Sequence, residues 1–146
     1  MNDYKYMLDD SLGYCLFHAS RLMINRLNNH FKKNNFPLTY EQWQIMSRLY
    51  EKNGQKQNEL ATRNERDQAS VSRLLDNMIK KNLVERVSHP TDYRVNVIYL
   101  TDYGEEIRSD LEELAKRTVA EASNGITEEE LQYCLDTLNK IRNNLK

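Results

Sequence analysis

The sequence predicts a mainly α-helical protein that carries one small β-hairpin. Apolar residues recur at steps of three and four along most of the 146 residues, as they do in amphipathic helices. The exception is "RVNVIYL", residues 94–100, where β-branched and aromatic side chains alternate as in a strand. Four Gly and two Pro are too few for long linkers or disordered segments. We therefore expect a single domain over residues 1–146.

Two helices are expected in the first third of the chain. The first spans about residues 4–34 and ends before Pro37, which disfavours helical geometry at the residue that precedes it. The second begins after Thr39, a suitable N-cap because Gln42 three residues later completes a capping box. Gly54 is expected to stop this second helix.

Two shorter helices follow, joined by a tight turn. The first covers about residues 56–63, and Asp67 is a suitable N-cap for the second. One face of the second helix is apolar and consists of Val71, Leu74, Leu75, Met78 and Ile79. Its other face is polar, which is the pattern of a helix-turn-helix motif whose second helix reads DNA. The alternative is an ordinary amphipathic helix with a solvated face.

The hairpin comes directly after this motif, with strands expected at residues 83–88 and 94–100. A hairpin in this place is a wing, so the predicted fold is a winged helix-turn-helix. A strand of about six residues extends about 20 Å. The tip of the wing can therefore reach the minor groove beside the major groove in which a recognition helix docks.

Both ends of the chain carry long amphipathic helices. The first of the two C-terminal helices is expected from Thr101 to about Ser123, and Thr127 with Glu130 forms a capping box for the second. The apolar stripe of the last helix consists of Leu131, Cys134, Leu135, Leu138, Ile141 and Leu145. The lobe of residues 39–100 is too small to cover these stripes. A homodimer is expected, with residues 1–35 and 102–146 as dimerisation helices.

Several motifs resemble those of the MarR family of bacterial transcriptional regulators. They are "LTYEQWQIMSRL" from Leu38, "NELA" from Asn58, "DQASVSRLLDNMIKKNLVER" from Asp67 and "HPTDYRVNVIYLTDYG" from His89. Where the family often has Gly after the recognition helix, Asn82 stands here and tolerates the same left-handed conformation. The resemblance implies a homodimer that binds a pseudo-palindromic operator, usually as a repressor. A small molecule or an oxidant often releases such a repressor from DNA.

Candidate DNA-binding residues follow from the motif and the wing. At the wing tip, Arg94 suits a narrow minor groove, and Asp92 can hold its guanidinium in place. The alternative for this pair is a surface ion pair worth at most about 1 kcal/mol. The start of the recognition helix offers Gln68, Ser70, Ser72 and Arg73 to base edges or phosphates. Lys56 and Arg63 are expected to bind phosphate.

Two further features bear on how such a regulator is controlled. The resemblance implies a pocket for an aromatic effector, for which the candidates are Tyr14, Phe17, His18, Trp43 and Tyr50. The start of the chain resembles the peroxide-sensing branch of the family, but the sensing cysteine of that branch aligns with Gly13. Cys15 lies two residues further on, about 200° around the helix. A redox role for Cys15 is therefore the alternative, and a buried, reduced thiol is expected for Cys15 and for Cys134.

Other function classes are disfavoured. Cys15 and His18 are too few ligands for a metal site, and neither a phosphate-binding loop nor a nucleophile–base pair is visible, so we expect no metal, no cofactor and no enzyme. The net charge of −1 does not decide for or against nucleic acid. No secretory or membrane-spanning segment is recognisable, so a soluble, cytoplasmic protein is expected. A winged-helix protein–protein interaction module without DNA binding is the competing class.

Overall fold

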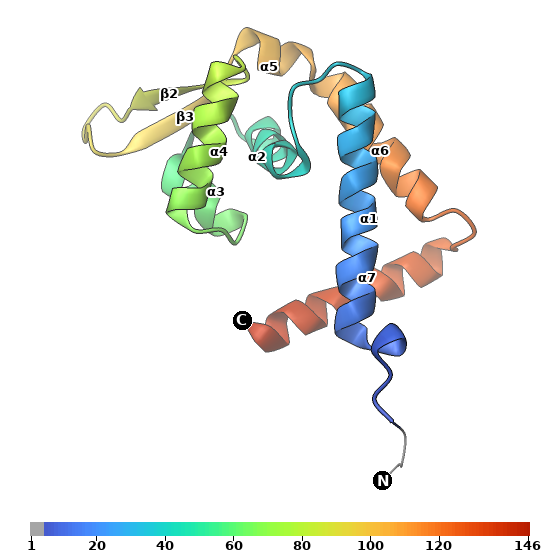
Figure 1. Ribbon diagram of the computed structural model, residues 1–146. Coiled ribbons are helices and arrows are strands. Elements are labelled where there is room, and N and C mark those ends of the chain that lie inside the picture. The colour runs from blue at the N-terminus through green and yellow to red at the C-terminus, as the bar shows by residue number, and fades with distance from the viewer. Residues whose placement is uncertain (1–4) are drawn as a thin grey trace.

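The computed structural model describes residues 5–146, which form helices around a three-stranded antiparallel sheet (Figure 1). In chain order the elements are η1 (Leu8–Asp10), α1 (Leu12–Lys33), α2 (Tyr40–Glu51), β1 (Gln55–Lys56), α3 (Gln57–Arg63), α4 (Gln68–Lys80), β2 (Val84–Ser88), β3 (Asn96–Leu100), α5 (Asp102–Glu106), α6 (Arg108–Ala122) and α7 (Glu128–Leu145). Element η1 is a single 3₁₀ turn. The lobe from α2 to β3 lies to one side of the upright α1, and the hairpin projects from the far side of the lobe (Figure 1).

The hairpin has the position expected of a wing, but its strands are shorter than predicted. Strands β2 and β3 pair from Val84 opposite Leu100 to Ser88 opposite Asn96. Beyond this last pair, the backbone N–H of His89 donates to the carbonyl oxygen of Val95 at 2.7 Å. Residues 89–95 therefore form the loop at the tip of the wing, where the predicted strands had left residues 89–93.

Strand β1 was not expected from the sequence. It pairs with β3, with Gln55 opposite Ile98, so the sheet order is β1-β3-β2. Gly54 precedes it with a φ of +80°, and a Cβ at this position would lie 2.6 Å from the ring of Tyr99. Glycine at this position therefore serves both the left-handed turn and the close approach to β3.

Local signals at the ends of the helix-turn-helix are confirmed. Asp67 caps α4, because its carboxylate accepts a hydrogen bond of 2.7 Å from the backbone N–H of Ser70. Asn82 follows α4 with a φ of 59°, the left-handed conformation expected of it. At the start of α2, the backbone N–H of Thr39 donates to the side-chain oxygen of Gln42 at 3.1 Å, as the capping box requires.

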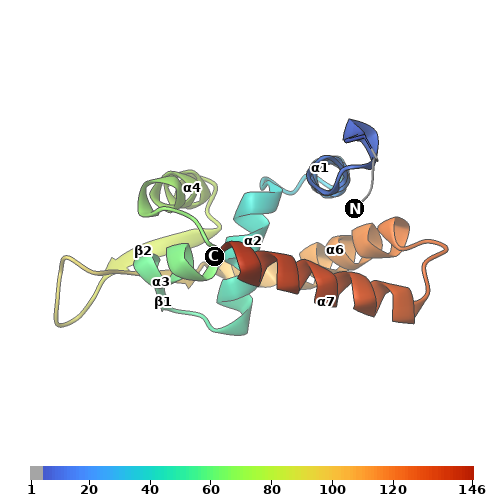
Figure 2. The same ribbon diagram turned by 90° about the horizontal axis from the view of Figure 1, so that it is seen from below.

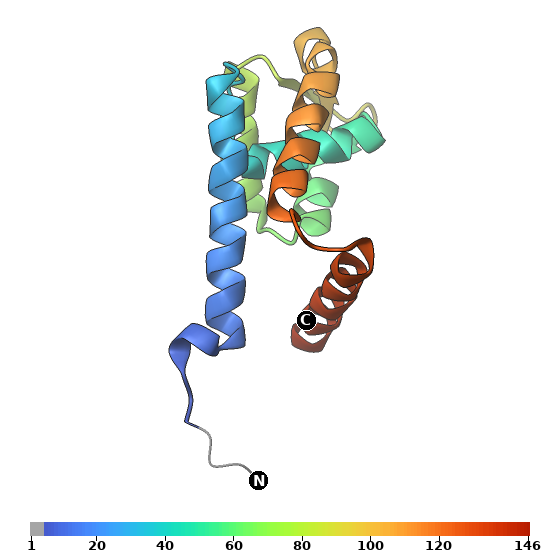
Figure 3. The ribbon, with the colours of Figure 1, turned by 90° about the vertical axis from the view of Figure 1, so that its right-hand side faces the viewer.

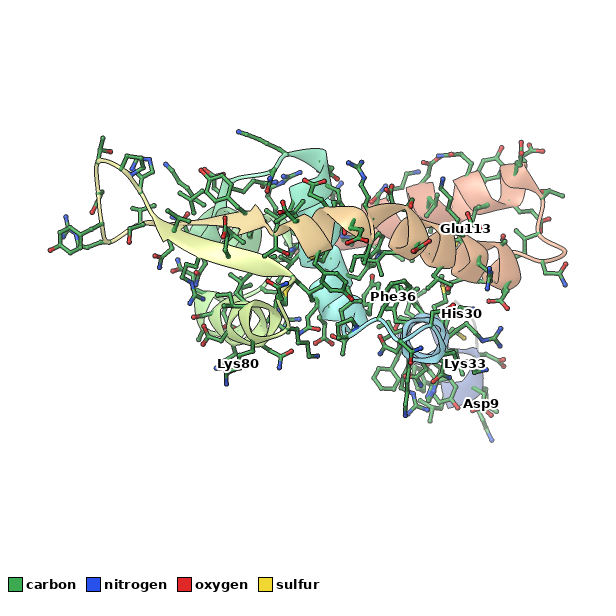
Figure 4. The ribbon with its side chains drawn as sticks, turned by 90° about the horizontal axis from the view of Figure 1, so that it is seen from above. Asp9, His30, Lys33, Phe36, Lys80 and Glu113 are labelled. Carbon is green, nitrogen blue, oxygen red and sulfur yellow. The ribbon has the colours of Figure 1, made fainter. Side chains whose placement is uncertain are left out.

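The hydrophobic core lies where α2, α4, the sheet and the C-terminal half of α1 meet. Its largest fully buried side chains come from all these elements and are Phe31, Ile45, Met46, Leu49, Leu60, Leu75, Met78, Leu83, Ile98 and Leu111. Leu111 extends the core to α6, which packs along α1 (Figure 4). The polar side of α4 is thereby presented on a packed core.

The first helix begins later than predicted. Its expected start at Tyr4 lies outside the described residues, and between there and Leu12 the chain forms the 3₁₀ turn of η1 followed by an extended Ser11. The hydroxyl of Ser11 donates to the carbonyl oxygen of Leu8 at 2.7 Å. Such a local side-chain bond competes with continuous helix, which explains why the apolar periodicity overestimated its length.

The helix expected from Thr101 to Ser123 is interrupted at Ile107, which separates α5 from α6. Helix α5 is fixed to the lobe, because the Tyr50 hydroxyl donates to the carbonyl oxygen of Gly104 at 2.6 Å. A Cβ on Gly104 would collide with the backbone of Leu83, so the close approach of α5 to Leu83 requires glycine. Helix α6 instead follows α1, and the change of neighbour accounts for the break.

Ion pairs fasten α6 to α1. Glu121 of α6 contacts His30 at 2.6 Å and Arg26 at 3.2 Å, both on α1. The pKa of the Glu121 carboxyl lies below its usual value, mainly because the carboxylate accepts a hydrogen bond from His30. Figure 4 labels His30 on the side of α1 that faces α6.

Helix α7 stands apart from the other helices (Figure 3), and seen from below it runs across the molecule with its C-terminal end near α3 (Figure 2). None of its residues is buried within the single chain, and its apolar stripe was predicted to pack against a second copy. Its C-terminal end reaches Glu65 in the turn between α3 and α4, through Arg142 at 2.8 Å and Lys146 at 3.0 Å. The single chain therefore leaves the stripe of its last helix uncovered.

Candidate nucleic-acid interface

The start of α4 presents a polar face that is ordered by its own cap. Besides accepting from the backbone of Ser70, the Asp67 carboxylate accepts from the Ser70 hydroxyl at 2.9 Å. These hydrogen bonds, the backbone one first, hold the pKa of Asp67 below its usual value. The oxygen of Ser70 also accepts from Arg73 at 3.4 Å. The side chains of Gln68 and Arg73 are exposed beside this cap, and Ser72 is half-buried.

Further along α4 the polar residues have different roles. The side chain of Asn77 accepts a 2.7 Å hydrogen bond from Gln42, which is buried, so Asn77 fixes the start of α2 against α4. Lys80 lies on the side of α4 away from the sheet (Figure 4). The part of α4 that is free to meet a ligand is therefore its first two turns.

At the wing tip, Asp92 binds Arg94 in two ways. One carboxylate oxygen of Asp92 accepts from the backbone N–H of Arg94 at 3.0 Å and from its guanidinium Nε at 3.3 Å. The side chain of Arg94 is nevertheless 80% exposed. The arrangement presents a guanidinium to solvent while limiting its freedom, as the sequence interpretation expected. Tyr93, between them, is 81% exposed and was not singled out from the sequence.

A small groove connects the wing to the recognition helix. It has a volume of about 150 Å³, and its lining residues are Gln57, Asn58, Gln68, Arg94, Val95 and Asn96. Two predicted residues, Gln68 of α4 and Arg94 of the wing, are thus brought to one surface. The amides of Gln57, Asn58 and Asn96 were missed. Their position beside Lys56 and Arg94 in the sequence was the only signal that pointed to them.

The two residues expected to bind phosphate differ in their freedom. Lys56 is exposed at the start of α3. The guanidinium of Arg63 is held by its own chain, since it donates to Gln55 at 2.9 Å and to Glu51 at 2.8 Å. Gln55 is buried, so this contact ties α3 to the sheet. Arg63 would have to leave these partners to meet a phosphate.

The aromatic candidates for an effector site fall into two separate groups. On α1, the ring of His18 lies 4.2 Å from that of Tyr14 and 5.0 Å from that of Phe17. On α2, the rings of Trp43 and Tyr50 are 6.3 Å apart. Burial raises the pKa of Tyr50, whose hydroxyl is the one bound to α5. Tyr50 therefore joins the lobe to the C-terminal helices.

An apolar cavity of about 280 Å³ lies between α1, α2 and α6. Its lining residues are Ser20, Met23, Ile24, Leu27, Tyr40, Trp43, Ala115, Thr118 and Val119. Of the predicted aromatic set, Trp43 lines this cavity. Its size and its few polar groups suit a small, largely apolar ligand.

The cysteines are not buried in the single chain, which corrects the prediction. Cys15 and Cys134 are both free and both exposed. The thiol of Cys15 donates to the backbone carbonyl of Asp9 at 3.5 Å. Cys15 lies on the apolar stripe in the first half of α1, and Cys134 lies on that of α7. The chain itself covers neither stripe, whereas the prediction had assumed that both were covered.

Within residues 5–146, no three His, Cys, Asp or Glu side chains lie close enough together to hold a metal ion. Among the helices in that range, none combines the length and apolarity needed to cross a bilayer.

Comparison with known proteins agrees with this geometry. A sequence profile of the MarR family matches residues 38–95, which include the helix-turn-helix and most of the wing. The HTH-type transcriptional regulator MgrA of Staphylococcus aureus is 31% identical over 139 residues, which are 94% of this chain and 91% of MgrA.

Solved structures show the same fold. The PcaV transcriptional regulator from Streptomyces coelicolor, in complex with its natural ligand, superposes with a TM-score of 0.88 at 16% identity, over 98% of this chain and 99% of PcaV. A mutant of MarR from E. coli, complexed with operator DNA, superposes with a TM-score of 0.81 at 22% identity, over 89% of this chain and 92% of that one. With the identity to MgrA over nearly the full length, these findings show that the chain belongs to the MarR family of transcriptional regulators.

Proposed function

We propose that this regulator binds a pseudo-palindromic operator as a homodimer and acts as a repressor. The observation that carries the proposal is the shared groove, in which Arg94 of the wing and Gln68 of α4 line one polar surface. In a winged helix-turn-helix protein, the second helix of the motif enters the major groove. The wing then meets the adjacent minor groove, whose negative potential attracts an arginine.

The likeness to MarR supports this orientation, because that structure holds operator DNA and shares the fold. We infer that α4 and the wing of this chain meet DNA in the same way. Lys56, which is exposed and directly precedes Gln57 of the groove, is placed to add a phosphate contact. A protein that acts on chromosomal DNA works where the chromosome is, so we place this one in the cytoplasm.

The uncovered apolar side chains support the homodimer. On α1, Leu12 is 60% and Leu22 is 66% exposed, and α7 contributes Leu135 at 48%. Patches of this kind mark protein–protein contacts. A second copy that covers both stripes would also place two recognition helices side by side, as a palindromic site requires.

A small-molecule effector is the second part of the proposal, and the cavity beside Trp43 supports it. PcaV, which shares the fold, holds its natural ligand in its structure. Trp43 is the only tryptophan in the sequence, so its fluorescence reports on this cavity without labelling. Titration with a series of small aromatic acids should quench or shift the emission for at least one of them. Emission that stays constant across the series would count against an effector at this cavity.

The operator itself can be tested by in vitro selection from a library of random DNA duplexes. The proposal predicts enrichment of sequences with two-fold symmetry, whose half-sites lie about one helical turn, 10–10.5 base pairs, apart. Enrichment of an asymmetric site would contradict the homodimeric reading. A library that shows no enrichment at all would instead favour a winged-helix module for protein contacts.

A further inference from the structure

Arg86 is an arginine on the DNA-facing lobe that plays no part in the function proposed above. It lies on β2 opposite Ile98 of β3. Its side chain is 26% exposed, in contrast to the 80% of Arg94. Side chains alternate along a strand, and Arg86 shares the face of the buried Val84. Its guanidinium is therefore turned toward the lobe.

The guanidinium of Arg86 joins the three elements that carry the DNA face. Its Nε donates to the side-chain oxygen of Gln57 on α3 at 3.0 Å, and its NH1 lies 3.0 Å from the carboxylate of Asp76 on α4. Its remaining nitrogen is buried and has no partner within the described residues. With this inward geometry, Arg86 is not placed to meet a phosphate.

The contact with Arg86 fixes the amide of Gln57. An amide can be rotated so that its oxygen and nitrogen exchange places, and a donor bound to the oxygen removes that freedom. Within residues 5–146, no group accepts a hydrogen bond from the nitrogen of Gln57. Gln57 lines the groove that also holds Gln68 and Arg94. Its two N–H donors thus remain for a ligand in that groove.

We propose that Gln57 binds a phosphate of the operator backbone through its amide nitrogen, and that Arg86, braced by Asp76, is the positioning residue that holds the amide in this orientation. The inference rests on the proposed DNA binding and adds a contact that carries no charge. Backbone phosphates accept hydrogen bonds from neutral side chains such as Gln as well as from Arg and Lys. A neutral donor releases no counterion, so this contact has a recognisable signature in salt.

The test is a double-mutant cycle in DNA affinity, measured by fluorescence anisotropy on a selected operator at several salt concentrations. Gln57→Ala should weaken binding about tenfold, as expected for one hydrogen bond to a charged group. Arg86→Gln should cost roughly fivefold in the wild-type background and less than about twofold once Gln57 is alanine. Neither change should alter the salt slope, which is the slope of the logarithm of DNA affinity against the logarithm of salt concentration. Arg94→Ala should reduce the magnitude of this slope by about one.

Asp76→Asn is a second test of the positioning role, and it can be made even if Arg86→Gln fails to fold. Asp76 is 56% exposed, so its replacement leaves the core intact. The loss of DNA affinity caused by Asp76→Asn should be smaller than the loss caused by Arg86→Gln. It should also vanish when Gln57 is replaced by alanine. Thermal melting of every variant shows whether the lobe remains folded.

The outcomes separate this inference from the proposed function. Additive losses for Gln57→Ala and Arg86→Gln, or full affinity in Gln57→Ala, would overturn the positioning role while DNA binding stood. A salt slope reduced by about one in Arg86→Gln would show that Arg86 itself meets a phosphate, and would overturn it also. Wild-type protein that binds no duplex would overturn the proposed function and this inference with it.

Discussion

The winged lobe and the last helix are opposites in how much of their own apolar surface the chain covers. In the lobe, Leu75, Met78 and Ile98 are completely buried. In α7, no residue is buried, and Leu145 is 82% exposed. The lobe is complete as a folding unit within one chain. Helix α7, by contrast, carries an apolar stripe whose cover must come from outside the chain.

The winged lobe and α7 therefore have different roles. Most of the stability of a helix in a protein comes from packing of its apolar face, so the 18-residue α7 needs a surface to pack against. Between the lobe and α7, the contacts at Glu65 are exposed ion pairs, which contribute little. We infer that the lobe determines which DNA is bound, and that α7 with the first half of α1 determines how many lobes bind together.

The largest expected effect comes from a cavity in the lobe. Leu75→Ala removes a completely buried side chain of α4 and should lower the free energy of unfolding by about 2–5 kcal/mol. Urea unfolding followed by circular dichroism measures this loss. Leu145→Ala is the matched control: at a protein concentration low enough to keep the chains separate, the same truncation on the uncovered stripe of α7 should cost far less. Equal losses at the two positions would remove the distinction between the regions.

A charge on the stripe of α7 should separate dimerisation from folding. Leu135→Glu places a carboxylate where the second chain is expected to pack, and should weaken the dimer roughly 100-fold, since a charge without a partner is costly to bury. Sedimentation equilibrium measures the association, and urea unfolding at low concentration measures the lobe. Asn143→Glu adds the same charge on the opposite side of α7, where the side chain is exposed, and should leave the dimer intact. A Leu135→Glu dimer as tight as wild type would show that α7 packs elsewhere.

At the wing tip, Arg94→Ala should weaken operator binding by about 1–3 kcal/mol and leave both dimer and melting temperature unchanged. The reason is that its side chain is 80% exposed and contributes to no core contact. Lys116→Ala on α6 removes the same charge away from the lobe and serves as the control. Fluorescence anisotropy compares the three proteins. Similar affinities for both variants would mean that Arg94 acts only through net charge.

The smallest expected effect is the pH dependence of the link at Glu65. Hydrogen bonds from Lys146 and Arg142, in that order, hold the pKa of the Glu65 carboxyl below its usual value. A carboxyl with a lowered pKa in the folded state stabilises the protein above its unfolded pKa, and this contribution is lost as pH falls through the folded one. The melting temperature of wild type should therefore slightly exceed that of Glu65→Gln at neutral pH. The two should converge in acid, and a constant difference would exclude this origin.

The sequence was informative where the structure depends on neighbouring residues. The cap of α4 at Asp67, the left-handed Asn82 and the pairing of Asp92 with Arg94 are all interactions within a few positions, and all were predicted. The break at Ile107 was missed, because it results from α5 and α6 packing on different parts of the molecule. Strand β1 was missed because two residues have no periodicity.

The candidate site shows the same division. Gln68 and Arg94 were predicted, one from its helix and one from its wing, but their common groove depends on tertiary structure. The amides of Gln57 and Asn96 enter this groove from separate elements and carry no sequence motif. Arg63 looked like a free cation in the sequence, and only the fold reveals its bonds to Glu51 and Gln55. The exposure of both cysteines likewise follows from the uncovered stripes.

In the proposed dimer, each lobe reads one half-site and the end helices join the two lobes. Sedimentation equilibrium of the wild-type protein with a selected operator duplex tests it most directly. The account predicts two chains on each duplex, and a free protein of about twice the 17.4 kDa of one chain. A free protein of one chain that binds the duplex singly with full affinity would contradict it.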